Sequence, residues 1–405
     1  MLKNAEWTAA RDLLLAKAVQ AGTETVSLDL CAGRILGSDL NAGEDVPPFD
    51  RSAYDGYAFR AEDTAGASRE NPVTLSITET IPAGRIGQKP VGPGLAAHLM
   101  TGARIPDGAD CVINFERTAF TETEVTLFSP MKPGDNIVRR GEDVRRGTLL
   151  APRGTEIDAG LAGSLAAQGV SRPEVFRRPV IGLISTGDEV VEPEEAQPEG
   201  GLRNANRAAF TALLLRDGCE VRYLGLCRDR EEEIAEKIRQ GLAECDALNL
   251  TGGVSVGDRD VTPAAMERCG AEMLVRGVEM KPGMACAYGV AEGKLILGLS
   301  GNPASSLTNR CACCLPALRK MAGRKNPLPG QLTAVMEQGF PKRSPGTRFL
   351  RGRLEIAEDG TVRFLSSAAQ GNAVLSSAVG CDTFLLIPAG SGPAAVGTRL
   401  RGFRI

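Results

Sequence analysis

The chain has 405 residues, which is too many for one ordinary hydrophobic core, so we expect two to four domains. An apolar content of 42% and a charged content of 24% argue against disorder, and a net charge of −3 argues against a general nucleic-acid binder. The sequence contains no apolar run near the roughly 20 residues that cross a bilayer and no signal-peptide core at its start, so we expect a cytoplasmic protein.

Residues 1–48 are predicted to form a helical linker segment. Thr8 is placed to cap a helix that runs to about residue 21, where Gly22 would end it. The consecutive prolines Pro47 and Pro48 exclude regular structure and mark the end of the segment.

Residues 49–138 are typical of a small β-rich domain. Short strands are expected at 73–77, 109–113 and 124–128, and turns containing Gly and Pro separate them. The chain then returns to the linker segment over residues 139–178, with a helix at about 158–168.

Residues 179–325 alternate strands with helices. In the helix predicted at 231–244, Ile234, Ile238 and Leu242 form one apolar stripe that would face a sheet. The strands are apolar throughout, which predicts an α/β domain with a parallel sheet covered on both faces. The expected strands are 180–184, 221–226, 247–250 and 295–299, and the other helices are 206–217 and 305–322. A linker follows, and residues 326–405 are typical of a small β-barrel or sandwich.

The most informative stretch is TGGVSVGDRD, at residues 251–260. Glycine lets backbone N–H groups approach an anion closely, and successive N–H groups can form an anion-binding concavity. The two carboxylates offer oxygen ligands to a hard cation such as Mg²⁺. The stretch predicts a site for a phosphorylated ligand with a divalent metal, although many Gly-rich turns only close a βα unit.

Ligands of open α/β sheets bind beyond the carboxyl ends of the strands, and four predicted strands here run into polar loops. Helix capping would explain any one loop alone, whereas four at one edge indicate a site. The acidic side chains of these loops would repel one another without a cation, so we predict a hydrated Mg²⁺ among Asp188, Glu189, Asp229 and Asp260. Lys281 would supply positive charge to a phosphate or oxyanion.

The eleven cysteines are scattered and odd in number, which does not suit a disulfide framework. The pair Cys311 and Cys314 has a C-x-x-C spacing that metal or redox sites use, but it lies within a predicted helix. We interpret these thiols as buried and reduced. His98 is the only histidine, which argues against Ser-His-Asp chemistry.

As a set, seven segments resemble the molybdopterin molybdenumtransferases, the family of bacterial MoeA and the gephyrin E-domain. They occur in the family's order over nearly the full length of the chain. The segments are PPFDRSAYDGYA at 47–58, MTGA at 100–103, RGED at 140–143, STGDE at 185–189, TGGVSVG at 251–257, KPG at 281–283 and GNP at 301–303.

The resemblance implies a fold of four domains. These are an elongated helical segment built from residues 1–48 and 139–178, a β-rich lid domain at 49–138, a molybdopterin-binding α/β domain at 179–325 and a C-terminal β-barrel at 326–405. It also implies a homodimer that uses the N-terminal segment, with each site between the α/β domain of one subunit and the lid domain of the other. Molybdopterin adenylyltransferase would be the upstream partner, and neither nucleic acid nor membrane is expected to bind.

The implied reaction joins molybdate to the dithiolene of adenylylated molybdopterin, with Mg²⁺ present, and releases AMP and molybdenum cofactor. Catalytic positions by resemblance are Asp55, Thr101 and Asp143 in the lid domain and Glu189, Asp229, Asp260 and Lys281 in the α/β domain. Metal ligands are Asp188, Glu189, Asp229 and Asp260. Substrate-binding positions are Ser185, Thr186, Gly187, Gly252, Gly253, Ser255, Gly257, Pro282, Gly283, Gly301, Asn302 and Pro303. Asp55 bracing its own turn and Thr101 capping one are the structural alternatives.

The chain departs from the family pattern at several positions. Met284 and Ala285 replace the last two residues of the usual Lys-Pro-Gly-Lys-Pro, and Pro263 replaces a second lysine. Each lost ammonium removes a charge-assisted contact worth about 1.5–3 kcal/mol. Ser300 stands where proline is usual, and the acidic residue commonly found before Asn206 is absent.

Three functions therefore remain open. The first is an active enzyme in which Arg259 or Arg276 offsets the lost lysines. The second is a non-catalytic paralogue that binds molybdopterin or nucleotide as a scaffold or carrier, and the third is a binder of other nucleotides. The sequence favours the enzyme because every expected catalytic carboxylate is kept. Tungstate would fit the same oxyanion chemistry as molybdate.

Overall fold

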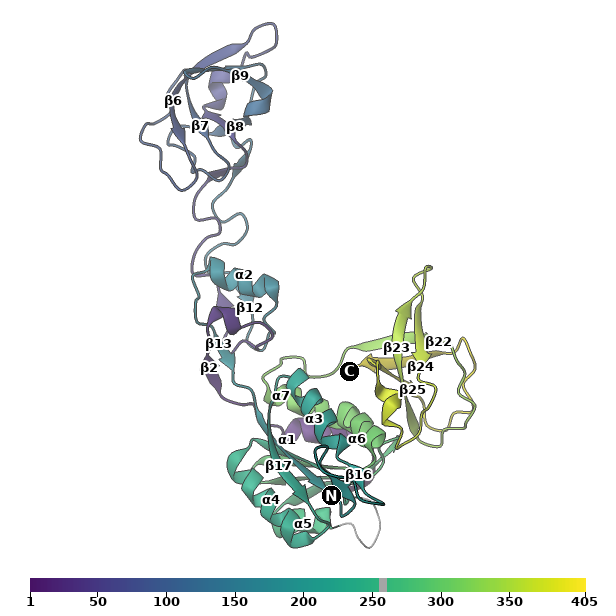
Figure 1. The fold of residues 1–405 in the computed structure, drawn as a ribbon. Helices are drawn as coiled ribbons and strands as arrows, with labels where there is room; N and C mark the ends of the chain where they lie inside the picture. Colours follow the sequence, from purple (N-terminus) through teal and green to yellow (C-terminus); the bar gives the residue numbers. More distant parts are fainter. Residues whose placement is uncertain (255–260) are drawn as a thin grey trace. The chain divides into compact units, whose positions relative to one another are not determined.

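The computed structural model describes residues 1–254 and 261–405 and contains two compact units (Figure 1). The first unit consists of Met1–Ser38, Arg153–Asp158 and Arg172–Ile405, and the second of Asp39–Pro152 and Ala159–Ser171. In the part of the chain that the structure describes, no helix has the length and apolar character needed to cross a membrane.

The first unit is built on one large sheet. Four parallel strands lie side by side in the order β17 (Glu220–Cys227), β14 (Val180–Thr186), β18 (Ala247–Thr251) and β21 (Lys294–Leu299). These strands confirm the predicted parallel α/β core. Their connections are crossovers through helices, as parallel neighbours require.

The sheet as a whole is mixed, so the prediction of a parallel sheet is wrong at one side. β20 (Cys286–Ala291) pairs antiparallel with both β21 and β19 (Glu272–Lys281). Only four residues join β19 to β20, and such a short connection permits a hairpin but no parallel crossover. β1 (Leu2–Glu6), which the sequence did not predict, adds a parallel strand beside β19.

Helices cover both faces of this sheet, as predicted (Figure 1). One core contains side chains from α1 (Trp7–Lys17), α3 (Ala205–Arg216), α6 (Pro303–Asn309) and α7 (Leu315–Met321). The other core contains side chains from α4 (Glu231–Glu244) and α5 (Thr262–Arg268), including the predicted stripe of Ile234, Ile238 and Leu242. Leu183 and Ile184 of β14 belong to different cores because successive side chains of a strand point to opposite faces.

Two predicted helices differ from the structure. α1 begins at Trp7 and ends at Lys17, so Thr8 lies inside the helix, and Ala18 already has extended backbone. The single helix predicted at 305–322 is divided into α6, a π-helical turn at Arg310–Cys314 and α7. Pro316, in the first turn of α7, has no N–H to donate, which explains why the α-helical pattern is interrupted just before it.

The π-helical turn holds the cysteine cluster. Cys311 and Cys314 are fully buried free thiols, which confirms their interpretation as core residues. Burial raises the pKa of the Cys314 thiol to about 12. At neutral pH this thiol therefore stays protonated and packs as a small apolar side chain.

The second unit contains a six-stranded sheet, which confirms the β-rich domain. Its order is β8 (Cys111–Asn114), β5 (Gly56–Phe59), β7 (Leu95–Leu99), β6 (Val73–Ile81), β10 (Glu124–Leu127) and β9 (Thr118–Phe120). Two short strand pairs and helix α2 (Ala159–Ala167) complete the unit. The pairs are β3 (Leu40–Asn41) with β12 (Leu149–Ala151) and β4 (Arg51–Ser52) with β11 (Ile137–Val138).

The remaining strands of the first unit are short ribbons and a C-terminal barrel. β2 (Thr23–Thr25) pairs with β13 (Glu174–Phe176), and β15 (Val190–Val191) pairs with β16 (Leu202–Arg203). The barrel runs through β23 (Thr347–Ile356), β24 (Val362–Ser366), β22 (Gln331–Met336), β26 (Arg399–Arg404) and β25 (Thr383–Ile387). β25 pairs back to β23, so the five strands close into a barrel rather than a sandwich.

Candidate active site

A cavity of about 530 Å³ lies at the carboxyl ends of the parallel strands. The ends of the four strands and the loops after them contribute to its wall, as the strand order predicts: Ser185, Thr186 and Gly187 at the end of β14, Asp229 after β17, Gly252 and Gly253 after β18, and Gly301, Asn302 and Pro303 after β21. We call this cavity the carboxylate pocket, because Glu189 and Asp229 line it. The structure therefore brings together most of the α/β site residues predicted from sequence.

The glycine loop fits closely against β14. Gly252 has a φ of 109°, and an added Cβ would lie 2.4 Å from Thr186 Oγ1 and 2.5 Å from the Thr186 carbonyl oxygen. Its N–H donates to the Leu299 carbonyl at 2.9 Å. That N–H is therefore engaged in the fold rather than free for an anion, which corrects the expectation of an anion-binding concavity at this residue. Gly252 is required for close packing instead.

Three polar side-chain atoms in the pocket wall are buried and have no hydrogen-bond partner among the described residues. They are Thr186 Oγ1, Asn206 Oδ1 and Asp229 Oδ1. Asn206 uses its other amide atom, Nδ2, to donate to the Gly301 carbonyl at 2.9 Å. Native proteins rarely leave buried polar atoms unpaired. Three such atoms in one pocket indicate that a polar ligand completes them.

The carboxylates of Asp188 and Glu189 lie close enough to affect the carboxyl of Asp229. The backbone N–H of Asp229 donates to Asp188 Oδ1 at 3.3 Å. The pKa of the Asp229 carboxyl is raised, first by burial and also by the negative charges of Asp188 and Glu189; the nearby Thr186 hydroxyl opposes this rise, although the two groups do not meet hydrogen-bond geometry. A bound cation would relieve this crowding.

These oxygen atoms suit a hard cation such as Mg²⁺, because Asp229 Oδ1 and Thr186 Oγ1 are both unpaired within the described residues. Outside residues 255–260, however, no group of three or more His, Cys, Asp or Glu side chains is arranged to hold a metal by itself. Mg²⁺ typically keeps several waters and binds through one or two carboxylates plus substrate phosphates. The donor set therefore fits a metal that a ligand shares.

Lys281, Pro282 and Gly283 lie at the end of β19, beside α6. The Gly283 carbonyl accepts a hydrogen bond from Asn309 Nδ2 at 2.6 Å, and a Cβ on Gly283 would lie 3.0 Å from Asn309 Cβ. Lys281 is exposed and has no ion pair among the described residues. None of the three lines the carboxylate pocket itself, so the structure places this loop beside α6 but outside the pocket wall.

Comparisons with known proteins agree with this arrangement. Residues 5–169 match a family model described as "MoeA N-terminal region (domain I and II)", residues 182–320 match "Probable molybdopterin binding domain" and residues 333–400 match "MoeA C-terminal region (domain IV)". The chain belongs to the MoeA family of molybdopterin molybdenumtransferases. It is therefore an enzyme of that class.

The relatives of this MoeA-family chain cover almost all of it. The molybdopterin molybdenumtransferase of Bacillus subtilis (strain 168) is 36% identical over 376 residues, which is 92% of this chain and 87% of that protein. The Staphylococcus epidermidis protein of the same name is 34% identical over 92% of this chain and 89% of its own length. A crystal structure of the molybdopterin biosynthesis moeA protein from Pyrococcus horikoshii OT3 is 30% identical, with a TM-score of 0.85 and complete coverage of both chains.

The expected lid residues of this MoeA-family chain lie in the second unit. Thr101 donates to Asp55 Oδ1 through its N–H at 2.5 Å and through Oγ1 at 2.7 Å. These two hydrogen bonds lower the pKa of the Asp55 carboxyl, the one from the side chain first. Asp143 is exposed, and its N–H donates to the Val46 carbonyl at 3.0 Å. The structure thus joins Asp55 to Thr101, and both side chains are exposed.

Four residues singled out from sequence fall in the 255–260 segment. Ser255, Gly257, Arg259 and Asp260 lie outside the described residues. Their assignments as substrate-binding, metal-binding or charge-supplying residues of the MoeA-family site remain predictions.

Sequence reasoning missed a partly buried charge network beside the carboxylate pocket. Glu192 accepts hydrogen bonds from the Tyr223 hydroxyl and from Arg207 Nη1, the latter at 2.7 Å. Asn204 Nδ2 also donates to Glu192, while Asn204 Oδ1 caps α3 by accepting from the Arg207 N–H. Burial would raise the pKa of Glu192, but these donors outweigh burial and lower it. The network joins the loop after β15 and the start of α3 to Tyr223 of β17.

A second missed residue is Arg351 of the C-terminal barrel. Its guanidinium is fully buried, with Nε donating to Ser377 Oγ at 2.9 Å and Nη2 to the Gly371 carbonyl at 3.1 Å. The segment after Gly371 reaches α6, where the Asn372 carbonyl accepts from the Ser305 N–H, and Ala373 lines the carboxylate pocket. The barrel thus contributes to the site through a segment that has no recognisable motif in the sequence.

Proposed function

We propose that this chain inserts molybdenum from molybdate into adenylylated molybdopterin, in a Mg²⁺-dependent reaction that releases AMP and molybdenum cofactor. The observation that carries the proposal is the set of three unpaired buried polar atoms, Thr186 Oγ1, Asn206 Oδ1 and Asp229 Oδ1, beside crowded carboxylates in a cavity of about 530 Å³. That volume falls within the range of small-molecule and cofactor sites.

In this proposal one or two of the carboxylates of Asp188, Glu189 and Asp229 would hold the Mg²⁺ together with phosphate oxygens of the substrate. The cation would neutralise charge on the phosphoanhydride of the substrate. The protein's own part is orientation: Asn206 Oδ1 accepts from a ligand N–H, and the Thr186 hydroxyl pairs with a ligand oxygen. Cleavage of an anhydride needs charge neutralisation more than a strong nucleophile, which is consistent with a pocket wall that has no histidine or cysteine among its described residues.

Lys281 is proposed to attract the oxyanion. Its ammonium is exposed at the end of β19. An exposed ammonium suits a tetrahedral dianion such as molybdate. We also propose a homodimer in which Asp55, Thr101 and Asp143 of one subunit complete the carboxylate pocket of the other.

The reaction is tested by incubating the purified chain with adenylylated molybdopterin, Mg²⁺ and molybdate and measuring AMP. We expect AMP release that requires both Mg²⁺ and molybdate. Tight binding of the substrate without AMP release would contradict the proposal and favour a carrier. Failure to bind the pterin would favour a binder of other nucleotides.

The shared site is tested by mixing two inactive variants, Asp55→Asn and Asp229→Asn, under conditions of subunit exchange. If each site takes Asp55 from one subunit and Asp229 from the other, half of the dimers are mixed and one of their two sites is intact. Activity should then recover to about a quarter of wild type, as two-fold symmetry requires. No recovery after verified exchange would show that both residues come from the same chain.

A further inference from the structure

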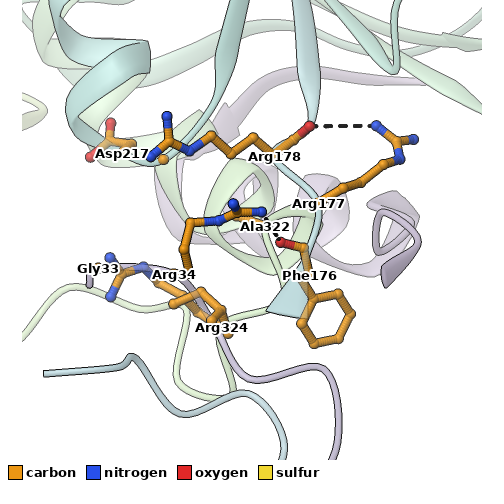
Figure 2. A pocket seen from close by; sticks show the side chains of 10 residues that line it. Gly33, Arg34, Phe176, Arg177, Arg178, Asp217, Ala322 and Arg324 are labelled. Carbon is orange, nitrogen blue, oxygen red and sulfur yellow. Dashed lines mark hydrogen bonds between the residues drawn. The ribbon is translucent and has the colours of Figure 1, made fainter. Parts of the chain in front are cut away.

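A second cavity lies at the opposite end of the same strands (Figure 2). Arg178 comes just before β14 and Gly218 just before β17, so this cavity is at the amino ends of the parallel strands. Its narrow space of about 20 Å³ has room for about one water-sized group. Because β14 has seven residues, the two cavities are separated by about 20 Å.

Four arginines from three distant parts of the sequence line this second cavity, which we call the arginine cavity, and one of them, Arg177, pairs with Asp246. Figure 2 shows the side chains of Arg34, Arg178 and Arg324 around it, with Arg178 extending toward Asp217. Arg34 donates to the Phe176 carbonyl at 2.9 Å and pairs with Glu24. Arg324 pairs with Glu156 at 2.5 Å, but its Nε is buried without a partner in the described part of the chain. Arg178 forms no side-chain ion pair with any described residue.

The carboxylate of Asp217, which lines the cavity, already interacts with two arginines that do not line it. It pairs with Arg310, whose side chain is fully buried, and lies 3.8 Å from Arg216 Nε. Nε and Nη2 of Arg310 have no hydrogen-bond partner in residues 1–254 and 261–405. A buried guanidinium with two unpaired nitrogens is costly unless another group completes it.

Further positive charge surrounds the same carboxylate. Arg319 Nε is also buried and unpaired within the described residues. Burial lowers the pKa of Arg319, and the neighbouring charges of Arg324 and Arg310 lower it further. Asp217 pairs with Arg310 and Arg216, and Glu156 pairs with Arg324, while the lining residues Arg177 and Arg34 pair with Asp246 and Glu24. Together with Arg178 and Arg319, the arginines outnumber these carboxylates, and buried nitrogens of Arg310, Arg319 and Arg324 lack hydrogen-bond partners among the described residues.

We propose that the arginine cavity binds one tetrahedral oxyanion of the phosphate, sulfate or molybdate type. One oxygen atom fits the narrow space, and the other oxygens remain at the mouth, where Arg178 and Arg324 lie. Guanidinium groups present paired N–H donors that match oxyanions better than a monatomic ion. A dianion also offsets the excess charge. The oxyanion is either a free ion or the phosphoryl group of a larger molecule, and the site is independent of the proposed reaction.

Calorimetric titration with sulfate tests this site. Mg²⁺ is left out and every protein carries Lys281→Ala, so that the carboxylate pocket and its lysine do not contribute. We expect one sulfate per chain. Arg178→Gln and Arg324→Gln should each raise the Kd for sulfate at least about tenfold, because each variant removes a charge-assisted contact. The matched control is Arg401→Gln, which changes an exposed arginine of the barrel and should leave the affinity unchanged.

Arg178→Gln is the more informative variant, because Arg178 is exposed and its loss should not impair folding. Sulfate should also raise the Tm of the parent protein more than that of Arg178→Gln. Equal affinity in the parent and both variants, or no saturable sulfate binding by the parent, would overturn the proposal. Competition by AMP would assign the site to a phosphoryl group of a larger molecule and the absence of competition to a free ion, and either result supports an oxyanion site.

Discussion

The carboxylate pocket and the arginine cavity lie at opposite ends of one parallel sheet and carry opposite excess charge. At the carboxyl ends, Asp229 is crowded by Asp188 and Glu189, and its Oδ1 is unpaired among the described residues. At the amino ends, Arg310 and Arg319 have buried nitrogens that are unpaired within the same part of the chain. In both places, buried atoms of charged side chains lack hydrogen-bond partners among the described residues.

Each region also contains a charged side chain that is paired with an opposite charge of the protein. Glu192 beside the carboxylate pocket pairs with Arg207 at 2.7 Å. Arg177 beside the arginine cavity forms two hydrogen bonds with Asp246, both at 2.6 Å. Charged side chains that are paired within the protein maintain the fold, whereas charged side chains with unpaired buried atoms are expected to bind a ligand. The following predictions test this distinction, from the largest expected effect to the smallest.

Replacing Asp229 by asparagine should reduce kcat for AMP release about 100-fold or more, because it removes a ligand of the proposed Mg²⁺, which would neutralise the reacting phosphate. Removing one of three crowded carboxylates should not lower Tm. Glu236→Gln changes an exposed carboxylate of α4 and serves as the control. Near wild-type kcat in Asp229→Asn would show that the carboxylate is not part of the active site.

Gly252→Ala should destabilise the protein by about 3 kcal/mol or more, because the new Cβ meets Thr186 backbone and side-chain atoms at 2.4–2.5 Å. Chemical denaturation measures this change. Gly270→Ala has a similar left-handed backbone, with φ of 77° and open space around the added carbon, so it should cost only about 1–2 kcal/mol. Equal destabilisation by both variants would mean that backbone conformation, not close packing, explains the glycine at 252.

Asp246→Asn should lower stability by about 1–2 kcal/mol at pH 7, since it breaks a double hydrogen bond to a partly exposed Arg177. Although burial opposes it, Arg177 and the Val180 N–H lower the pKa of Asp246. A lowered carboxyl pKa contributes stability above the unfolded value of 3.8, and this contribution is lost as pH falls through the folded value.

The difference in Tm between wild type and Asp246→Asn should therefore shrink below about pH 4. The matched control is Glu244→Gln, which breaks the more exposed contact of Glu244 with Arg222 and should change stability less than Asp246→Asn does. A Tm difference for Asp246→Asn that stays constant from pH 7 to pH 3 would contradict this assignment.

Met284→Lys restores a lysine that the family usually has and should lower KM for adenylylated molybdopterin by about three- to tenfold at low salt. Met284 is 61% exposed, so the longer side chain needs no repacking. Ile356→Lys, at a barrel position that is 77% exposed, adds the same charge elsewhere. Equal effects of the two variants would show that net charge, not position, changes KM.

Much of the α/β region could be predicted from sequence because strands and helices alternate there with clear apolar periods. The helix at Glu231–Glu244 has the predicted bounds, and the loops after β14, β17, β18 and β21 meet at one edge as the topology of parallel strands requires. The hairpin of β19 and β20 was missed, since local apolar patterns do not state which strands pair. β1 was missed because five residues at a terminus become a strand only when β19 offers an edge.

The two candidate ligand sites also differ in how far they could be predicted from the sequence. The residues of the carboxylate pocket follow strands directly, so their convergence could be inferred from strand order. The arginine cavity combines Arg34, Arg178 and Arg324 with the buried Arg310, and tertiary folding alone brings these four segments together. The unpaired Asn206 Oδ1 is likewise visible only once α3 and the loop after β21 are in place.

In this account, unpaired charged groups bind a ligand and paired ones maintain the fold. Calorimetric titration of Mg²⁺ into the wild-type protein, Asp229→Asn and Glu192→Gln tests this claim most directly. We expect wild type to bind Mg²⁺ and Asp229→Asn to bind it at least about tenfold more weakly. Glu192→Gln should bind Mg²⁺ as wild type does, because the Glu192 carboxylate already forms an ion pair with Arg207. Equal binding by all three proteins, or loss of binding only in Glu192→Gln, would contradict the account.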